Sequence, residues 1–396
     1  MSPSDVVIAS AARTPIGSFL GSLAPLPAPR LGAAAISAAI ERAKIASAAV
    51  DQVIMGNVLQ AGIGQAPARQ AGIYAGIRKS AGAITVHKVC GSGMRAVMDA
   101  ANGIKGGEWR VVVAGGMESM SNAPHLLERA RTGFRMGEIK VADSMIKDGL
   151  WDPYGDKHMG NCAELCATKY GFTRAEQDAF SLTSYKRAQA AIERGLFADE
   201  LVAVQVPQKK GEPVSVAKDE EPFAAPLDKM GGLRPAFDPK GTVTAANSSK
   251  IDDGAAALVV TSAERARELS AKPLARIVAQ GSVAQEPEWF TTAPALAAKL
   301  VLERAGLAVK DIDRWEINEA FAVVTMAAIR DLGLDPETVN VRGGAVALGH
   351  PIGASGARIL TTLVHTLVHD KRRYGCAAIC IGGGEAAAVI VENLRL

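Results

Sequence analysis

The sequence predicts an α/β protein of two similar halves with a loop-rich lobe inserted between them. Short apolar runs alternate with small-residue helical patterns at both ends of the 396-residue chain, which is typical of parallel α/β units. The two ends also repeat one order of features: a Ser-Gly helix start, an apolar helix and a strand that stops on glycines. Between them, residues 121–247 contain more Met, charge and Pro and fewer β runs.

In the first 120 residues, apolar runs predict strands and small-residue stretches predict helices. A Gly- and Pro-rich loop follows the opening strand. The expected strands cover residues 6–9, 53–58, 84–89 and 111–114, and the expected helices cover 31–46, 66–73 and a segment that begins near Gly91.

Within the lobe, residues 182–194 are helical by pattern and residues 207–241 are loop-like. Strand and helix then alternate again, and Ser262 has the side chain preferred at a helix N-cap. The expected strands cover 255–260, 277–279, 314–317 and a final pair, and the expected helices cover 263–271, 294–305 and a segment from about Glu319.

These patterns divide the chain into three parts. We expect residues 1–120 and 248–272 to form the N-terminal half, residues 121–247 the lobe, and residues 273–396 the C-terminal half. The repeated segments run from CGSGMRAV to VVVAGG and from GASGARIL to AAICIGGG. If the halves are related, the two Ser-Gly helix starts face each other across a shared site.

The composition narrows the class of protein. The net charge is +3 without a dense Lys/Arg block, which disfavours a nucleic-acid partner. No run reaches the roughly 18 apolar residues that cross a bilayer, and the N-terminus lacks the pattern of a secretory signal, so we expect no membrane association. Five cysteines, an odd number, indicate reduced thiols and a cytoplasmic location.

Cys90 is a candidate nucleophile. It lies in KVCGSGMRA, between an expected strand and an expected helix. A helix N-terminus lowers the pKa of a thiol, and flanking glycines let a substrate approach the backbone. A buried, inert cysteine is the alternative, and this segment alone leaves both open.

Three further side chains suit such a nucleophile. His350 stands in GGAVALGHPIGASGARI, where little bulk separates the imidazole from a thiol proton. Cys380 ends the last strong strand, just before glycines whose free amides could bind an oxyanion. Asn318 follows a short strand and is either an N-cap or a side chain that holds a water in the site.

Other Cys and His residues are expected to have structural rather than catalytic roles. His158, Cys162 and Cys166 share i, i+4, i+8 spacing. A structural zinc site usually has four ligands and a tighter Cys pair, so no metal is expected. His365 and His369 are interpreted as solvated residues on a helix surface.

The successive motifs of the whole chain resemble those of the thiolase family. Their combination in this order is far more specific than any single motif. It runs RTPIGSFLGSL, VCGSGMRAV, VVVAGGMESMSNAP, HMGNCAEL, RPAFDPKGTVTAANSS, DDGAAALVV, EINEAFA, GGAVALGHPIGASGARIL and CIGGGE. RTGFRMGE and SMIKDGLWDPYGDKHMG resemble the lobe of short-chain, acetoacetyl-CoA-type members.

The resemblance implies a role for each candidate. Cys90 would carry the acyl group, His350 would deprotonate Cys90 and help bind the thioester oxygen, and Cys380 would move the Cα proton of acetyl-CoA. Asn318 would hold a water at one oxyanion site, and the amides of Cys90 and Gly382 would form the other. Positions that match contacts to the pantetheine arm or acyl pocket are Leu150, His158, Met159, Phe237, Ala245, Ser249, Ala320 and Phe321.

The resemblance also implies architecture and partners. The two halves would form a thiolase-like, five-layered αβαβα core, and the lobe would bind CoA and mediate assembly, usually into a homotetramer. The substrates would be acetyl-CoA, acetoacetyl-CoA and CoA, with no metal or redox cofactor.

Five features depart from the family pattern, and one of them is EPEWFTTAP, where many members have a Gly-Pro-rich stretch. His87 stands where Asn is usual, Lys250 where Gly is more frequent, and Glu385 where Met or Gln is common. The stretch DEEPFAAPLD lacks the Arg that short-chain relatives often carry, which bears on the grip on the CoA nucleotide. The catalytic residues remain, so the departures concern acyl preference and CoA affinity.

The implied function is that of an acetyl-CoA C-acetyltransferase, a reversible Claisen condensation of two acetyl-CoA molecules. The nearest alternative is a degradative 3-ketoacyl-CoA thiolase for longer chains, against which a pocket lined by Met159 and Phe321 would argue. A decarboxylating ketoacyl synthase would need a second histidine where Asn318 stands. A catalytically dead relative is disfavoured by the intact set of candidate residues.

Overall fold

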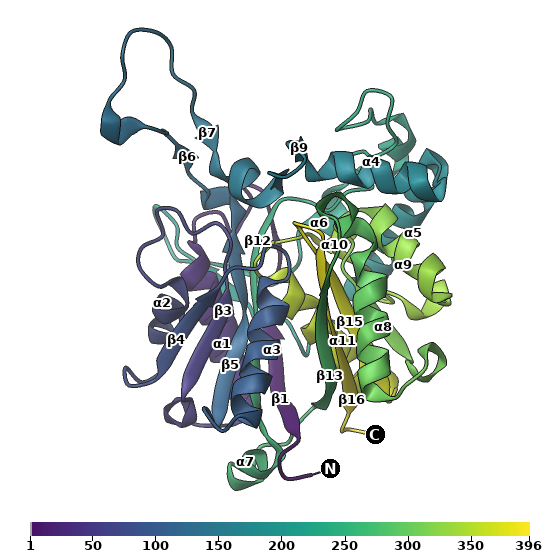
Figure 1. The fold of residues 1–396 in the computed structure, drawn as a ribbon. Helices are drawn as coiled ribbons and strands as arrows, with labels where there is room; N and C mark the ends of the chain where they lie inside the picture. The colour runs from purple at the N-terminus through teal and green to yellow at the C-terminus, as the bar shows by residue number, and fades with distance from the viewer. Residues whose placement is uncertain (1) are drawn as a thin grey trace.

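The computed structural model describes residues 2–396, and five alternating layers of helix and sheet make up its body (Figure 1). The elements that precede the lobe in the chain are β1 (Val6–Arg13), β2 (Gly17–Ser18), α1 (Ala28–Ala43), β3 (Gln52–Gly56), α2 (Pro67–Tyr74), β4 (Gly82–Val86), α3 (Ser92–Lys105) and β5 (Val111–Ser119). The first two elements after the lobe are β12 (Asp252–Ser262) and α7 (Ala263–Glu268). The strands and α-helices that follow α7 are β13 (Ala275–Ala284), α8 (Ala293–Ala305), β14 (Arg314–Ile317), α9 (Ala322–Leu332), α10 (Ala345–Leu348), α11 (Ser355–Asp370), β15 (Tyr374–Ile381) and β16 (Glu385–Asn393).

Alternate residues of each strand enter different layers, because successive side chains of a strand point to opposite faces. In β1, Val7 packs with α1, whereas Ile8 packs toward α3 and α11. In β15, Ala377 faces the same central helices, whereas Cys376 faces α8. The predicted αβαβα layering is therefore confirmed, with α3 and α11 as the central layer.

The strands form a mixed sheet in the order β14-β15-β16-β13-β1-β12-β5-β3-β4, with β2 beside β12. Its two parts join where Val7 and Ile8 pair with Arg276 and Ala275. Among the described strands, parallel pairing is limited to β3 with β4, β3 with β5, and β14 with β15. The expectation of parallel units was wrong for the centre of the sheet, because β12 and β16 return antiparallel to β5 and β15.

The two central helices meet at their N-termini. A Cβ atom on Gly356 of α11 would lie 2.5 Å from the amide nitrogen of Met94 in α3. A Cβ atom on Gly93 would lie 2.9 Å from the amide nitrogen of Ala357. Only glycine permits so close a backbone approach. The prediction that the two Ser-Gly helix starts face each other is confirmed.

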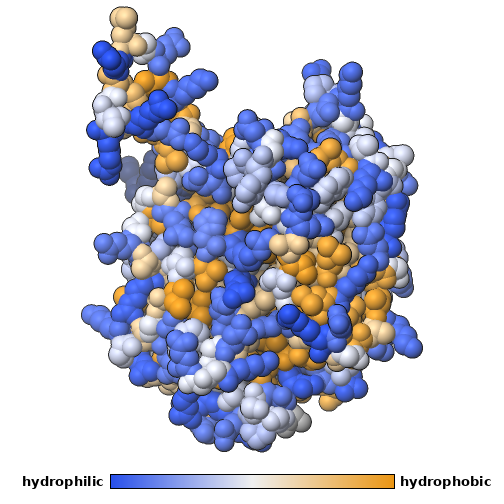
Figure 2. All heavy atoms as spheres, in the orientation of Figure 1, coloured by the Kyte–Doolittle hydropathy of each residue, from blue (hydrophilic) through white to orange (hydrophobic). Residues whose placement is uncertain are grey.

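The lobe between β5 and β12 has little sheet. Its helices are α4 (Met159–Tyr170), α5 (Arg174–Glu193) and the short α6 (Glu221–Ala224), and its strands pair as β6 (His125–Leu126) with β7 (Ala142–Asp143), β8 (Trp151–Asp152) with β9 (Lys157–His158), and β10 (Val204–Val206) with β11 (Val214–Val216). The β6–β7 hairpin projects from the body (Figure 1). Hydrophobic side chains lie among hydrophilic ones on this projection (Figure 2).

Helix α11 departs from one expectation. His365 is buried, and its Nε2 lies 3.0 Å from the carbonyl oxygen of Ala11. The prediction that His365 is solvated was wrong, because α11 lies between the two parts of the sheet rather than on the surface. His369, one turn later, is exposed and pairs with Asp370. None of the helices in residues 2–396 is both long enough and apolar enough to cross a membrane.

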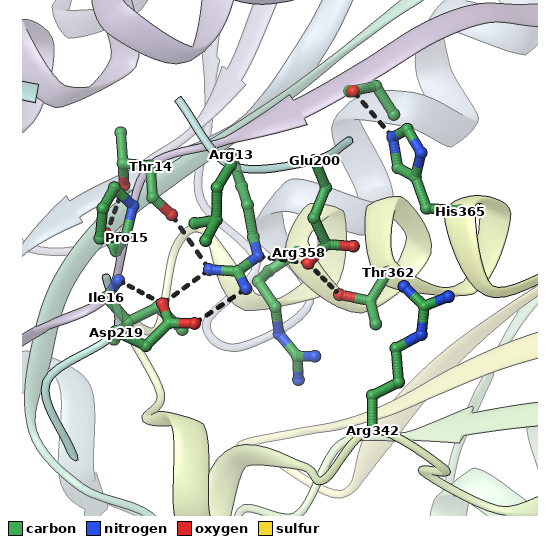
Figure 3. Close-up of polar contacts among 12 residues, drawn as sticks. Arg13, Thr14, Pro15, Ile16, Glu200, Asp219, Arg342, Arg358, Thr362 and His365 are labelled. Atoms are coloured by element: carbon green, nitrogen blue, oxygen red, sulfur yellow. Dashed lines mark hydrogen bonds and ion pairs between the residues drawn. The ribbon is translucent and has the colours of Figure 1, made fainter. Parts of the chain in front are cut away.

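A buried ionic cluster ties the lobe to the first strand (Figure 3). Nε of Arg13 donates to Glu200 at 2.5 Å, and its two terminal nitrogens donate to Asp219 at 2.7 and 2.9 Å. All three side chains are fully buried. Thr362 of α11 also donates to Glu200 at 3.1 Å. The cluster thus joins β1, the lobe and the central helix behind the functional site.

Candidate active site

Cys90 lies in the tight turn between β4 and α3. Val89 has φ of 44°, a left-handed conformation that costs a β-branched residue free energy. The hydroxyl of Ser92, the first residue of α3, accepts from the amide of Lys88 at 2.8 Å and donates to the carbonyl of Val89 at 2.6 Å. These two bonds hold the turn in which the thiol is presented.

The surroundings of the Cys90 sulfur have opposing effects on its pKa. Burial raises the thiol pKa to about 12, while hydrogen bonds from the amides of Cys90 and Gly382 act to lower it. The sequence predicted a lowered pKa at this helix N-terminus, but loss of hydration exceeds the effect of the backbone donors. Cys90 is therefore a neutral thiol at rest and needs a base.

His350 has the state that such a base requires. Its Nδ1 lies 2.6 Å from the hydroxyl of Ser355, which donates its own proton to the carbonyl of Pro351 at 2.9 Å. Nδ1 must therefore carry the imidazole proton, which leaves Nε2 as an acceptor. Nε2 is buried without a partner. Burial, and then the charge of Arg358, lower the pKa of His350 to about 3, so the ring is neutral.

Cys380 is the penultimate residue of β15 and lies near Cys90. Its thiol is buried, and burial together with the nearby Cys90 sulfur raises its pKa well above that of an ordinary thiol. The glycine run follows directly, and a Cβ atom on Gly382 would lie 3.3 Å from Val89 and 3.4 Å from Met159. The loop after Cys380 thus packs against the nucleophile turn.

Asn318 leaves an unusual polar group inside the protein. Its backbone amide donates to Ala378 of β15 at 3.0 Å, but neither side-chain atom has a partner although the residue is buried. The N-cap interpretation is wrong, since α9 starts at Ala322 with Phe321 as its N-cap. A buried amide without partners is costly, so its free donor and acceptor suit a bound water or substrate oxygen.

A cavity of about 380 Å³ opens onto this centre. His350 lies in its wall. Six of the predicted substrate contacts line it as well: Leu150, His158, Phe237, Ala245, Ser249 and Phe321. The other two, Met159 and Ala320, lie in a buried cluster with Cys380. The cavity wall thus contains His350 and six of the eight predicted contact residues, and the other two lie in the cluster around Cys380.

Aromatic rings form one side of this cavity. His158 stacks on Phe237 with ring centroids 4.7 Å apart, and Phe237 meets Phe321 edge-on at 5.9 Å. Nδ1 of His158 accepts from the amide of Gly160 and so caps α4. A ring wall of this kind favours an apolar chain over a charged one.

Two buried carboxylates that the sequence analysis missed support the site. Glu118 accepts from the amides of Val58, Leu59 and Gly353, so it joins loops from both ends of the chain. Asp252 accepts from the amide of His350 at 2.6 Å. Both residues lie inside motifs of the family pattern. The local sequence does not indicate, however, which distant backbone groups a buried strand residue will bind.

The positions that depart from the family pattern make contacts of their own. Lys88 and Glu385 form an ion pair between the nucleophile turn and the start of β16. His87 accepts from the amide of Val89 at 3.4 Å, a long bond. Lys250 lines the cavity beside His350.

The three residues with metal-like spacing are otherwise engaged. His158 caps α4 and stacks on Phe237, while Cys162 and Cys166 are buried in the cluster that contains Cys380. Within residues 2–396, no three His, Cys, Asp or Glu side chains are placed to hold a metal ion.

A half-buried thiol at one helix start, with a second thiol and backbone donors near its sulfur and a neutral imidazole at the facing helix start, is typical of a thiol-dependent acyltransferase. The chain belongs to the thiolase family: the model "Thiolase, N-terminal domain" matches residues 6–264 and "Thiolase, C-terminal domain" matches residues 271–393.

Individual relatives cover the whole chain. An acetyl-CoA acetyltransferase of Cupriavidus necator is 52% identical over 98% of this chain and 99% of its own. Acetyl-CoA acetyltransferase 2 of Arabidopsis thaliana is also 52% identical, over 100% and 98%. The crystal structure of the Ascaris suum thiolase Acat5 in complex with coenzyme A has a TM-score of 0.94 and 46% identity, and covers 98% of this chain and 100% of that chain. The family and fold implied by the motifs are therefore confirmed.

Proposed function

We propose that this chain is an acetyl-CoA C-acetyltransferase, which condenses two molecules of acetyl-CoA reversibly to acetoacetyl-CoA and CoA. The observation that carries the proposal is His350, whose Nε2 is free while Ser355 holds Nδ1. Such an imidazole is ready to take the proton of Cys90. Full-length relatives with 52% identity carry the name of this activity.

In the first half-reaction, Nε2 of His350 takes the thiol proton of Cys90. The sulfur forms a bond to the thioester carbonyl carbon, and the bond from that carbon to the CoA sulfur breaks. The neutral thiol of Cys380 gives its proton to the CoA thiolate, which leaves as CoA, and His350 keeps the proton of Cys90 as an imidazolium. Because the amides of Cys90 and Gly382 point at the Cys90 sulfur, they are placed to bind the acyl oxygen attached next to it.

In the second half-reaction, the thiolate of Cys380 takes a Cα proton from a second acetyl-CoA. Its raised pKa makes that thiolate a strong base. The free amide of Asn318, through a water, and His350 stabilise the enolate oxygen. The carbanion attacks the acyl carbon, the bond to Cys90 breaks, and the imidazolium of His350 returns its proton to the Cys90 thiolate, while Cys380 keeps the Cα proton and is a neutral thiol again. CoA thiol replaces the carbanion when the reaction runs toward cleavage.

The acyl end of the site is small, which separates this proposal from a longer-chain 3-ketoacyl-CoA thiolase. Met159 and Phe321 are both buried in the cluster around Cys380. Their side chains occupy the volume that further methylenes of an acyl chain would need. The cavity lined by Leu150, Phe237, Ala245 and Ser249 then holds the pantetheine arm.

Thiolysis of two substrates tests the proposal. Purified protein is assayed with CoA and either acetoacetyl-CoA or 3-ketohexanoyl-CoA, beside the Cys90→Ala variant. We expect faster cleavage of acetoacetyl-CoA, lost in Cys90→Ala. Preference for the longer substrate would favour the degradative alternative, and no turnover of either would overturn the assignment.

Under this proposal, the lobe of residues 121–247 also binds CoA and mediates assembly into a homotetramer. The two catalytic halves are formed by residues 1–120 with 248–272 and by residues 273–396. The projecting hairpin supports this, since large hydrophobic side chains on it face solvent: Leu127, Phe134, Met136, Ile139 and Val141. Light scattering behind a sizing column should give the mass of four chains, and replacing residues 128–140 by a short Gly-Ser link should reduce it. A monomeric wild type would contradict this part.

A cytoplasmic location and independence from metal and redox cofactors complete the proposal. All five cysteines are free, and the chemistry needs Cys90 and Cys380 reduced, which suits a reducing compartment. Each proton transfer above is made by a side chain of this protein. Activity that survives dialysis against a chelator would support the second point, and loss restored by a metal ion would contradict it.

A further inference from the structure

Lys250 occupies the wall of the substrate cavity but is turned into the protein. Its Nζ donates to the carbonyl of Ala245 at 2.5 Å and to that of Ser248 at 3.1 Å. It also lies 5.7 Å from the ring centre of Tyr185 in α5. Two of the three N–H donors of this ammonium are therefore bound to backbone carbonyls of the protein.

The backbone that Lys250 holds belongs to the site. Ala245 and Ser249 line the cavity. The amide of Ser249 donates to the carbonyl of Ala320 at 3.0 Å, two residues after Asn318. The turn of residues 244–249 therefore rests on the segment that carries the orphaned amide, and a shift of the turn moves both walls of the cavity.

The charge of Lys250 also lies close to the general base. Burial lowers the pKa of Lys250, and the negative charges of Glu221 of α6 and Asp252 of β12 act in the opposite direction. Asp252 is the same carboxylate that accepts from the amide of His350 at 2.6 Å. Burial and Glu221 raise the pKa of Asp252, and the positive charge of Lys250 counteracts this and favours the ionised form of Asp252.

We propose that Lys250 is a positioning residue of the acyl-transfer site: its ammonium clamps the turn 244–249 against the Asn318 segment and offsets the charge of Glu221 and Asp252 beside His350. The inference rests on the proposed function. It assigns a role to a position at which this chain departs from the family pattern.

Three variants separate the effect of the hydrogen bonds of Lys250 from the effect of its charge. Lys250→Gln keeps hydrogen-bond donors for the carbonyls without the charge, Lys250→Met removes both, and Lys250→Arg keeps both. Lys186→Met, on the exposed face of α5, is the matched control. The measurement is kcat and KM for acetoacetyl-CoA thiolysis from pH 9 down to the lowest pH at which circular dichroism shows an intact fold, because the pKa of His350 is about 3.

We expect kcat/KM of Lys250→Met to fall by about 10- to 100-fold because the turn is displaced. Loss of a nearby positive charge favours the protonated imidazole, so the acid limb of kcat/KM should move to higher pH in Lys250→Met and Lys250→Gln. Lys250→Arg should restore the wild-type limb. The ionisable groups around His350 and Lys250 are Glu118 of β5, Tyr185 of α5, Glu221 of α6, Asp252 and Asp253 of β12, and Arg358 of α11.

The outcomes are distinguishable. An inactive wild type would refute the proposed function. An active wild type whose Lys250→Met and Lys250→Gln variants match it in KM, kcat and acid limb would refute the role of Lys250 alone. If Lys250→Met fails to fold, Lys250→Gln and Lys250→Arg decide: unchanged pH profiles in both would overturn the inference.

Discussion

The hydroxyl of Ser355 lies 2.6 Å from Nδ1 of His350 and donates to the carbonyl of Pro351 at 2.9 Å. This chain of two bonds fixes the tautomer of the buried imidazole and leaves Nε2 as the acceptor. Ser355 is also the first residue of α11, so the helix start that meets α3 orients the general base as well.

Ser355→Ala should therefore weaken catalysis more than binding. Without the acceptor for Nδ1–H, the imidazole loses its fixed tautomer and orientation, and kcat should fall by up to about 100-fold with KM nearly unchanged. Steady-state kinetics with acetoacetyl-CoA measure both constants. Ser355→Thr, which keeps the hydroxyl, should recover most of the rate, and equal loss in both variants would count against the hydrogen bond.

Asn318→Ala should remove one oxyanion donor. Loss of a preorganised donor lowers kcat by about 10²- to 10³-fold, since the enolate oxygen would lose the water that the amide holds. Asn102→Ala, on the exposed side of α3, serves as the control and should keep full activity. A kcat within twofold of the wild type in Asn318→Ala would contradict the assignment.

In the free enzyme, the thiol of Cys90 should ionise only at high pH. The raised pKa of Cys90, about 12, means that the thiolate fraction grows tenfold per pH unit through the alkaline range. Alkylation of Cys90 by iodoacetamide should rise without a plateau between pH 7 and 10. A plateau near pH 8 would instead show a thiolate–imidazolium pair, which would conflict with the neutral His350 and its pKa of about 3.

Enlarging the acyl end should change the chain-length preference. Met159→Ala and Phe321→Ala each open space beside Cys380, and one methylene in an apolar pocket is worth about 1–3 kcal/mol. The ratio of kcat/KM for 3-ketohexanoyl-CoA over acetoacetyl-CoA should rise about tenfold or more. An unchanged ratio in both variants would place the acyl chain elsewhere.

Arg13→Met should cost stability far from the chemistry. It leaves the fully buried carboxylates of Glu200 and Asp219 without their cation, which typically costs about 3–5 kcal/mol. Urea unfolding measures the difference. Arg110→Met, which breaks the exposed pair with Glu268, should cost less than about 1 kcal/mol, and similar losses in the two variants would contradict the view of a buried anchor.

The sequence predicts the candidate catalytic residues better than it predicts the residues that hold them in place. Cys90, His350 and Cys380 stand at strand and helix ends beside glycines, so the local sequence pattern is enough to single them out as candidates. Glu118, Asp252 and Ser355 act through partners far along the chain or through a specific rotamer. No local pattern encodes such partners, which explains why they were missed.

The fold shows the same division. Strands and helices with clear periodicity were predicted, but pairing direction was not, since β12 follows the lobe and returns antiparallel to β5. The error at His365 has the same origin: the sequence of α11 has charged and polar residues like a surface helix, yet the second part of the sheet covers it.

Mass spectrometry of the protein after mixing with acetyl-CoA tests the central claim most directly. The proposed mechanism predicts one added acetyl group, located on the peptide that contains Cys90, which is released when CoA is added. Turnover of acetoacetyl-CoA without acetylation of Cys90, or with acetylation of Cys380 instead, would contradict it.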